Sequence, residues 1–355
     1  MIDLYSMTLP ELETYVVSIG EPKFRAKQIA LWLKEGTPIA SMSNLSRSLR
    51  DKLMSAVTDT LPTVEEKLVS KIDGTVKYLF RLYDGECIES VLMHYEHGYT
   101  LCISSQVGCR MGCKFCASTL LGRVRDLLPS EMLGQIIAAQ KDAGIRISNV
   151  VMMGIGEPLD NYDNVVRFLY LVNDPVGLNI GYRHISLSTS GVVPRILDLA
   201  REGLPITLSI SLHASSDEQR SAIMPINRKW PITELLSACV AYYKSTGRRI
   251  SFEYTLISGK NDSEEDARAL AKLLRGAFAG TDAPIHVNLI RVNEVVETGM
   301  RQGSVESANR FAEVLCERGV VATVRRRLGS DVNAACGQLR RSAAARKGCG
   351  DDSGN

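Results

Sequence analysis

From residue 99 onward the chain alternates between short strand-like stretches and longer helical stretches. The six candidate strands are Tyr99 to Gln106, Asn149 to Gly154, His184 to Ser190, Ile206 to His213, Ile250 to Ile257 and Ile285 to Val292. Because repeated strand–helix units are typical of a parallel sheet covered by helices, the sequence predicts an α/β fold. We expect a partial (β/α)6 barrel over residues 99–338, with functional side chains at the carboxyl ends of its strands.

The segments on either side of the predicted barrel have different patterns. Residues 1–60 predict a small helical N-terminal accessory domain, since a capping box starts at Thr8 and leucines repeat at four-residue spacing further on. Residues 61–98 predict a β-meander, or hairpin extension, because Asp-Gly pairs at 73–74 and 84–85 are a strong turn signal. Residues 339–355 are expected to form a flexible basic tail.

The charge balance alone identifies no partner. The 355 residues include 42 Lys and Arg and 40 Asp and Glu, so a nucleic-acid partner would have to contact local basic clusters such as 325–327. No run of about 18 apolar residues predicts a membrane span. The N-terminus lacks the pattern of a secretory signal, which favours the cytoplasm. Nine cysteines in so long a chain do not fit a secreted disulfide scaffold.

Three cysteines lie close together after the first predicted barrel strand, in the stretch CRMGCKFC. Cys109, Cys113 and Cys116 offer thiolates, which suit a soft metal centre. A structural zinc site usually has four protein ligands, and none of the five histidines lies in this loop. A [4Fe–4S] cluster fits better, since three held irons leave the fourth open to a chelating small molecule. A fully ligated electron-transfer cluster stays an alternative, with Cys336 or Cys102 as the fourth ligand.

Three further strand ends carry residues that suit a ligand site. The stretch MMGIGEP places Gly154, Gly156 and Glu157 after the second strand, and glycines let a ligand approach the backbone closely. SLSTSG and SLH end the third and fourth strands with hydroxyls and with His213. Taken singly, such glycines are typical of turns, and such hydroxyls often satisfy local backbone. Their shared position at strand ends favours a binding site.

These motifs resemble those of a known enzyme family. CRMGCKFC resembles the signature of the radical S-adenosylmethionine enzymes, in which the methionyl amino and carboxylate groups chelate the open iron. The chain from about residue 5 to 340 resembles the bacterial adenine-C2 methyltransferases that act on 23S rRNA and tRNA. The matching stretches are EPKFRAKQI, TLCISSQVGC, KFCAST, NVVMMGIGEP, LSTSGVVP, ISLHA, IMPIN, VNLI and NAACGQL. One departure is Arg291, where the family usually has proline.

The resemblance implies a radical-SAM barrel that holds one [4Fe–4S] cluster on Cys109, Cys113 and Cys116. The implied S-adenosylmethionine contacts are Gly156, Glu157, Ser188, Ser211, Leu212, His213 and Asn293. The implied substrates are an adenosine in the peptidyl-transferase centre of 23S rRNA and an adenosine next to the anticodon of tRNA. Lys23, Arg25 and Lys27 of the helical N-terminal unit are expected to contact the RNA backbone.

The resemblance also implies a reaction that consumes two molecules of S-adenosylmethionine. The first methylates the thiol of Cys336, and the second yields a 5′-deoxyadenosyl radical that removes hydrogen from that methyl group. The resulting methylene radical adds to adenine C2, Glu89 accepts the C2 proton, and Cys102 releases the product through a transient disulfide. The implied electron donor is a small flavodoxin- or ferredoxin-type protein, and the enzyme is expected to be a monomer.

Three alternatives stay open from the sequence. A related C8 methyltransferase, an antibiotic-resistance enzyme, shares the cluster and the methylcysteine chemistry. A radical-generating activase would modify a partner protein and would not need Cys336. A non-enzymatic iron–sulfur or zinc protein would bind RNA without cleaving S-adenosylmethionine.

Overall fold

The computed structural model describes residues 2–58, 60–292, 299–332 and 339 of the chain. Its main element is one sheet of ten strands in the order β1-β2-β3-β4-β7-β8-β9-β10-β11-β12. These strands are β1 (Thr63–Val69), β2 (Val76–Arg81), β3 (Cys87–Tyr95), β4 (Gly98–Cys102), β7 (Ile147–Met152), β8 (Ile185–Thr189), β9 (Thr207–Ser211), β10 (Ile250–Leu256), β11 (Ile285–Arg291) and β12 (Val321–Val324). The first four pair antiparallel, and from β4 to β12 every pairing is parallel.

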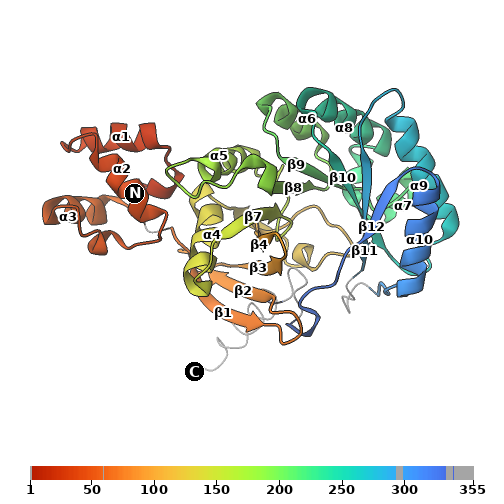
Figure 1. The fold of residues 1–355 in the computed structure, drawn as a ribbon, viewed down its shortest axis with the longest axis horizontal. Helices are drawn as coiled ribbons and strands as arrows, with labels where there is room; N and C mark the ends of the chain where they lie inside the picture. Colours follow the sequence, from red (N-terminus) through yellow and green to blue (C-terminus); the bar gives the residue numbers. More distant parts are fainter. Residues whose placement is uncertain (1, 59, 293–298, 333–338, 340–355) are drawn as a thin grey trace, which may run out of the picture.

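The predicted α/β fold with a parallel, curved sheet is confirmed (Figure 1). The six predicted strands correspond to β4, β7, β8, β9, β10 and β11, and β12 is a further parallel strand that the sequence analysis did not predict. The first predicted strand was too long. β4 ends at Cys102, and Gln106 begins a separate short strand, β5 (Gln106–Gly108), which pairs with β6 (Arg123–Asp126).

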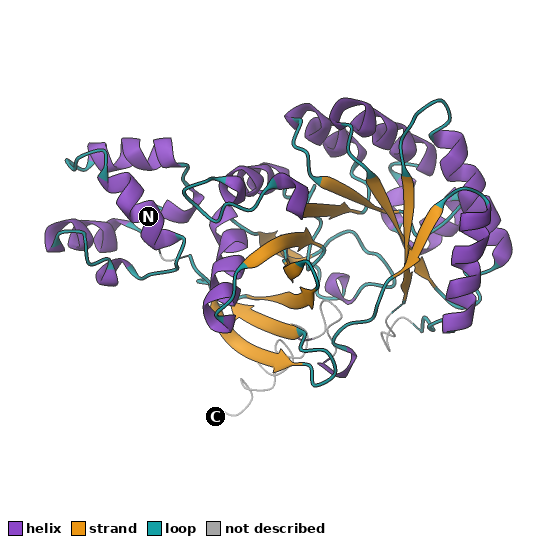
Figure 2. Cartoon of the chain, in the orientation of Figure 1, coloured by secondary structure: helices purple, strands orange, loops and turns teal. Residues whose placement is uncertain are grey.

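Helices cover the outer side of the curved sheet and leave its inner side to the strands (Figures 1 and 2). They are α4 (Pro129–Ala143), α5 (Tyr162–Asn173), α6 (Val193–Glu202), α7 (Asp217–Ile223), α8 (Ile232–Thr246), α9 (Glu264–Ala277) and α10 (Val305–Glu317). Fully buried side chains such as Phe168 and Phe252 belong to one large core between the two layers. This packing leaves the inner side of the sheet to polar residues and to the candidate site.

The turns predicted before the barrel are confirmed. Gly74 and Gly85 lie between β1, β2 and β3 with φ of 72° and 84°, a conformation that glycine adopts readily. Residues along each strand then alternate between the two faces of the sheet. Tyr78 and Phe80 pack in the main core, so Lys77 lies on the opposite, inner face.

Three helices precede the sheet, at the left of Figure 1: α1 (Leu9–Ser18), α2 (Arg25–Leu33) and α3 (Arg47–Ala56). The predicted capping box at the start of α1 is present, since Thr8 N donates to the Glu11 carboxylate at 2.8 Å. The three helices pack around an apolar cluster of their own, separate from the barrel core. No helix in the described part of the chain combines the length and the apolar character needed to cross a membrane.

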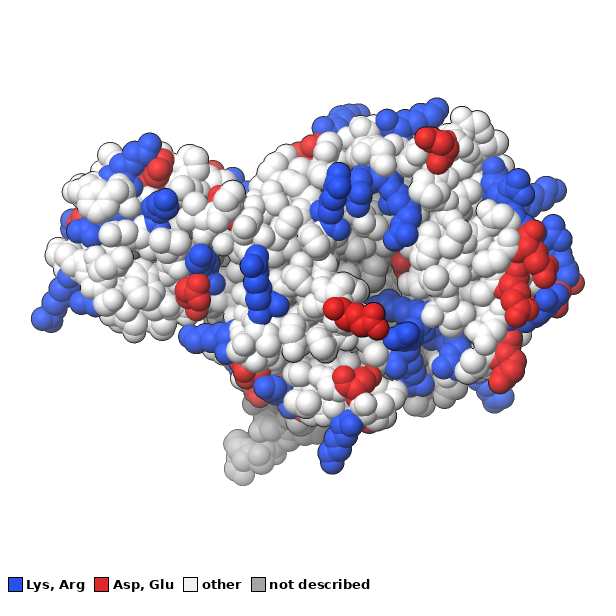
Figure 3. Space-filling view, in the orientation of Figure 1, with Lys and Arg blue, Asp and Glu red and all other residues white. Residues whose placement is uncertain are grey.

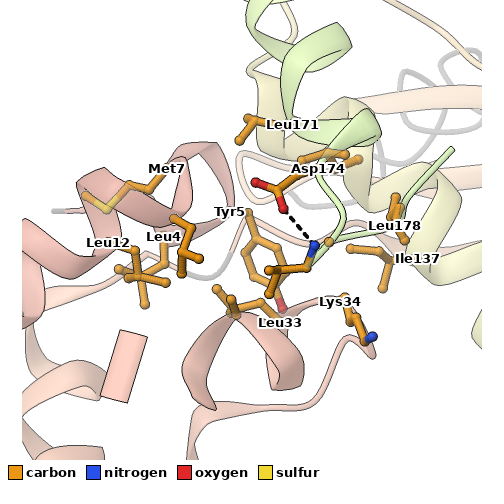
Figure 4. A pocket seen from close by; sticks show the side chains of 15 residues that line it. Leu4, Tyr5, Met7, Leu12, Leu33, Lys34, Ile137, Leu171, Asp174 and Leu178 are labelled. Atoms are coloured by element: carbon orange, nitrogen blue, oxygen red, sulfur yellow. Dashed lines mark hydrogen bonds between the residues drawn. The ribbon is translucent and has the colours of Figure 1, made fainter. Parts of the chain in front are cut away.

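An apolar contact joins these helices to the barrel. Leu4 and Leu33 lie across a small cavity from Ile137 of α4 (Figure 4). Beside it, Arg167 of α5 donates to the backbone carbonyl of Ser6 at 3.0 Å. Burial and this charge-assisted hydrogen bond hold the helical unit against the barrel.

Candidate active site

A short hairpin closes the loop that carries the three cysteines. β5 precedes Cys109 and pairs with β6, and Cys109 N donates to the carbonyl of Gly122 at 3.1 Å. Gly108 has φ of 80°, and a Cβ on it would lie 1.8 Å from the Gly122 carbonyl oxygen. Only glycine fits there without moving backbone, so the two ends of the cysteine loop meet because residue 108 has no side chain.

Hydrogen bonds fix the interior of the same loop. Cys116 N donates to the carbonyl of Cys113 at 3.1 Å, and Thr119 Oγ1 donates to the carbonyl of Cys116 at 2.9 Å. Lys114 N donates to the carbonyl of Ile223, at the end of α7, at 2.9 Å. The loop is therefore held by contacts within itself and to the barrel.

The loop and the strand ends enclose one cavity of about 1180 Å³, counting its open mouth. The predicted site residues that line it are Cys109, Cys113, Cys116, Gly156, Glu157, Ser188, Ser211 and His213. Segments from the cysteine loop and from the ends of β7, β8 and β9 thus meet at one place, as expected for the carboxyl edge of a parallel sheet. Two predicted residues, Asn293 and Cys336, lie outside the described residues.

The three thiols form a soft donor set in a low-dielectric cavity. Burial raises the pKa of Cys109 to about 12 and also raises the pKa of Cys113. The Cys116 thiol raises both pKa values further, and Cys109 adds to the rise at Cys113. Such thiols ionise only beside a cation, which a metal centre provides. No three His, Cys, Asp or Glu side chains among the described residues are arranged to hold a single metal ion. The three thiols of this loop would suit an iron–sulfur cluster, for which thiolates are the usual ligands.

Gly154 and Gly156 turn out to be required by packing. A Cβ on Gly154 would lie 2.6 Å from the carbonyl oxygen of Ile103, and one on Gly156 would lie 2.7 Å from Gln106 N. The loop after β7 therefore packs directly against the chain that links β4 to β5. Both glycines also line the cavity, where the sequence analysis expected them to admit a ligand. Close packing against the neighbouring backbone is a second reason why glycine is needed at these two positions.

Glu157 joins the ends of two neighbouring strands. Its carboxylate accepts hydrogen bonds from Ser190 N at 2.7 Å and from Leu159 N at 3.0 Å. Its own backbone N donates to Gln106 Oε1 at 2.9 Å. Burial raises the pKa of this carboxyl, and the hydrogen bonds that it accepts oppose the rise. Glu157 thus shapes the cavity wall and also exposes a carboxylate to the cavity.

His213 is held as a neutral imidazole. Burial and, to a lesser extent, the charge of Arg220 lower its pKa to about 3. Thr255 N donates to its Nδ1 at 2.9 Å, so the ring proton is on Nε2. Its backbone φ of 57° is uncommon for a residue other than glycine, and its ring packs edge-on against Phe115 of the cysteine loop, with centroids 4.8 Å apart. The cavity therefore has a fixed, uncharged hydrogen-bond donor.

Sequence reasoning missed Arg220, which is fully buried beside the site. Its guanidinium donates to the carbonyls of Ser190 at 2.6 Å, Ser211 at 3.0 Å and Leu212 at 3.1 Å, and to Asn227 Oδ1 at 2.9 Å. Burial lowers its pKa to about 10, so it stays protonated at neutral pH. All four acceptors are neutral, and its charge lowers the pKa of Cys113. Arg220 therefore ties strand ends together and places a positive charge beside the cysteine loop.

Glu89 and Cys102 lie on the inner face of the sheet rather than on the wall of the cysteine cavity. Lys77 pairs with Val91, and Val91 pairs with Cys102, so Lys77, Glu89 and Cys102 share one face. Lys77 Nζ lies 3.1 Å from the Glu89 carboxylate, with both side chains buried. Burial raises the pKa of Cys102 to about 11, and the charge of Arg325 opposes this. The buried Lys77–Glu89 ion pair is a second feature that the sequence analysis did not predict.

Leu212, a predicted cofactor contact, does not line the cavity that the described residues enclose. Its side chain is buried in the main core, and its carbonyl accepts the hydrogen bond from Arg220. The structure therefore places Leu212 behind the wall of the cavity.

A curved parallel sheet with a thiol-lined cavity at its carboxyl edge is the architecture of the radical S-adenosylmethionine enzymes. Residues 103–271 match the model of the radical SAM superfamily, and residues 2–58 match the model of the ribosomal RNA large subunit methyltransferase N-terminal domain. The chain is 53% identical to proteins named "Probable dual-specificity RNA methyltransferase RlmN" from Alkaliphilus oremlandii and Clostridium botulinum. The alignments cover 96% of this chain and 98% and 97% of those proteins.

A solved structure agrees with these relatives. The crystal structure of a radical SAM methyltransferase from Sphaerobacter thermophilus has a TM-score of 0.89 and 43% sequence identity to this chain, and the match covers 95% of this chain and 99% of that one. The chain belongs to the RlmN family of radical SAM RNA methyltransferases. Membership in the superfamily implies a [4Fe–4S] cluster and S-adenosylmethionine as cofactors.

Replacing Gly108 with alanine should prevent the cysteine loop from closing, because the new Cβ meets the carbonyl of Gly122. After anaerobic reconstitution we expect G108A to bind less than about one tenth of the iron and sulfide that the wild type binds. The matched control is G122A, since that residue also has positive φ, 67°, but a Cβ there has no neighbour within 4 Å. Equal iron content in G108A and the wild type would contradict this role.

The neutral state of His213 makes the fold sensitive to acid. An unfolded histidine binds a proton below a pKa of about 6.5, whereas folded His213 does so only near 3. Stability should therefore fall as pH drops from 6.5 towards 3. Between pH 7 and pH 5, H213Q should gain about 2 kcal/mol in unfolding free energy relative to the wild type, measured by urea denaturation. If the difference in unfolding free energy between H213Q and the wild type does not change with pH, His213 is not held neutral.

Proposed function

We propose that this chain methylates C2 of adenine in 23S rRNA, at the peptidyl-transferase centre, and in tRNA, next to the anticodon. The observation that carries the proposal is the meeting of Cys109, Cys113 and Cys116 with Glu157 and His213 in one cavity. The names of its relatives support RNA as the substrate. The buried polar residues on the adjoining inner face support chemistry beyond simple cofactor binding.

The chain's own residues suit the two cofactors. Thiolates of the three loop cysteines would hold the cluster, leaving one iron without a protein ligand. The Glu157 carboxylate would accept a hydrogen bond from the methionyl ammonium, and the Nε2–H of His213 and the hydroxyls of Ser188 and Ser211 would bind other polar groups of S-adenosylmethionine. Asn293 remains a proposed contact from the family resemblance. When bound, the cluster and two molecules of S-adenosylmethionine per turnover supply a methyl group and a 5′-deoxyadenosyl radical.

The transfer to carbon would depend on Cys336, Cys102 and Glu89. The Cys336 thiolate would take the methyl group by displacement. A thiol is needed because C2 of adenine is too electron-poor to attack the sulfonium methyl group as a nucleophile. After loss of a hydrogen atom from that methyl group, a carbon–carbon bond forms to C2. The adduct would return one electron to the redox system that supplied the electron for radical formation, and Glu89 would take the C2 proton. Cys102 thiolate then attacks the Cys336 sulfur, and the carbon–sulfur bond breaks. The new carbon takes up a proton to become methyl, and two electrons from the reductant restore the thiols.

Leu339 supports a place for Cys336 near these residues. Leu339 packs with Leu79 and Cys87 in one small apolar cluster, on the inner face that also carries Glu89 and Cys102. Cys336 precedes Leu339 by three positions in the sequence, and an extended chain over three positions spans about 11 Å. The Lys77 ammonium compensates the buried charge of Glu89, which supports a carboxylate as the acceptor of the C2 proton.

The remaining partners are proposed from the resemblance. A small flavodoxin- or ferredoxin-type protein would deliver electrons to a monomeric enzyme in the cytoplasm. Of the proposed N-terminal RNA contacts, Lys23 pairs with Glu13 at 3.0 Å and Arg25 donates to Asn44 O at 3.0 Å. Binding RNA through these two side chains would therefore require an exchange of internal contacts for phosphate contacts.

The test is an anaerobic assay with tRNA or a 23S rRNA fragment, followed by nuclease digestion and mass spectrometry. We expect 2-methyladenosine from the wild type and none above background from C336A, because no thiol then carries the methyl group. The matched control C316A should keep full activity, since Cys316 is exposed at the end of α10. Formation of 8-methyladenosine would overturn the C2 assignment, and an active C336A would overturn the methylcysteine route.

A further inference from the structure

A second cavity opens inside the barrel at the amino-terminal ends of its strands. It encloses about 960 Å³ and is lined by Arg183 and Arg249, which precede β8 and β10, and by hydroxyls of Ser186, Ser209 and Ser251. We call it the amino-end cavity. The hydroxyls line up across neighbouring strands, with Ser186 Oγ and Ser209 Oγ 3.2 Å apart. Its wall is unusually polar for a ligand site.

The amino-end cavity adjoins the cysteine cavity. Met153, Glu253 and Arg325 line both. Cys102 lies beside this junction, because its strand partner Val151 lies two residues before Met153 and the charge of Arg325 acts on its thiol. A molecule that fills the amino-end cavity can therefore place one end next to the proposed reactive thiol, on the far side of the junction from the cluster loop.

The charge of the amino-end cavity suits an anion. Glu253 is the one acidic residue in its described wall, and the charge of Arg325 acts on that carboxyl. Arg183 and Arg249 form no ion pair with a carboxylate among the described residues. Glu253 is itself held by Asn288 Nδ2 at 2.7 Å. Figure 3 shows Lys and Arg side chains on both sides of a hollow near the middle of the molecule. Guanidinium groups at the mouth of such a hollow match the geometry of phosphate oxygens.

The rim also carries an aromatic pair. Tyr95 and His97, from the β3–β4 hairpin, line the amino-end cavity and stack on each other with ring centroids 5.3 Å apart and planes 10° apart. Unpaired bases of single-stranded RNA bind proteins by stacking on such rings. Arginines for phosphates and a flat aromatic surface for a base, in one cavity, are the two elements of a single-strand binding site.

We propose that the amino-end cavity binds the RNA strand that carries the target adenine, with Arg183 and Arg249 contacting its phosphates and Tyr95 and His97 stacking on a neighbouring base. This inference rests on the proposed function, because it takes the substrate to be RNA. The adenine would reach the cysteine cavity through the junction at Met153. RNA and cofactor would thus enter the barrel from opposite ends, and Cys102 would lie where they meet.

Charge reversal of the two exposed arginines tests the proposal. We expect R183E/R249E to bind fluorescein-labelled tRNA about tenfold or more weaker than the wild type, by fluorescence anisotropy on the reconstituted holoenzyme. Losing two phosphate contacts should lower the slope of log Kd against log salt by about 1.4. The matched control is R195E/R201E, which changes the charge equally on the outer helix α6, where both arginines are exposed and contact Asp198.

Equal tRNA affinity for R183E/R249E and R195E/R201E would overturn the proposal. A second arm uses adenosine monophosphate as the probe. If R183E/R249E loses binding of that nucleotide but keeps wild-type affinity for tRNA, the cavity takes free nucleotides and the RNA assignment is wrong. The spectral change of the cluster on adding S-adenosylmethionine shows, independently of RNA binding, whether each variant is folded and binds the cofactor. Failure of the wild type to bind tRNA or to methylate adenine would instead refute the proposed function itself.

Discussion

The successive parallel pairing of neighbouring strands from β4 through β7, β8, β9 and β10 to β11 is the constraint on which the site depends. Parallel strands need long connections, which here are helices on the outer side, and they bring carboxyl ends far apart in sequence to one edge. Cys109, Glu157 and His213 meet for this reason, although more than 100 residues separate the first from the last. The same pairing leaves an interior that contains two adjoining cavities.

Buried polar groups then set the shape of that edge. Glu157 joins the ends of β7 and β8, and Arg220 joins the ends of β8 and β9 through neutral carbonyls. Each costs desolvation, which the hydrogen bonds that it makes must offset. A positive guanidinium beside the cysteine loop is favourable when the loop holds ionised thiolates. Arg220, Glu157 and neutral His213 therefore give this edge a buried positive charge, a buried carboxyl and a neutral hydrogen-bond donor, which suit the proposed cluster and cofactor.

Local patterns in the sequence predicted the elements, the cysteine loop and most of the cavity wall, because strand ends and clustered thiols are visible in short stretches. Arg220 and Lys77 were missed for a physical reason. Arg220 lies on the short, charged helix α7, where an arginine normally faces solvent. Lys77 lies in β2, and Glu89, with which it forms an ion pair, lies in the next strand, β3. Burial and cross-strand pairing depend on tertiary packing. Residue 108 must be glycine because the carbonyl of Gly122 lies against it. The two residues are too far apart in sequence for a local pattern to reveal this contact.

The central claim is that three cysteines hold a cluster whose fourth iron takes S-adenosylmethionine. Electron–nuclear double resonance on the reduced cluster, with ¹⁵N in the methionyl amino group, tests it most directly. We predict a hyperfine coupling between that nitrogen and the cluster, which disappears without S-adenosylmethionine. A reduced cluster that shows no such coupling at saturating S-adenosylmethionine, because a fourth side chain occupies the iron, would contradict it.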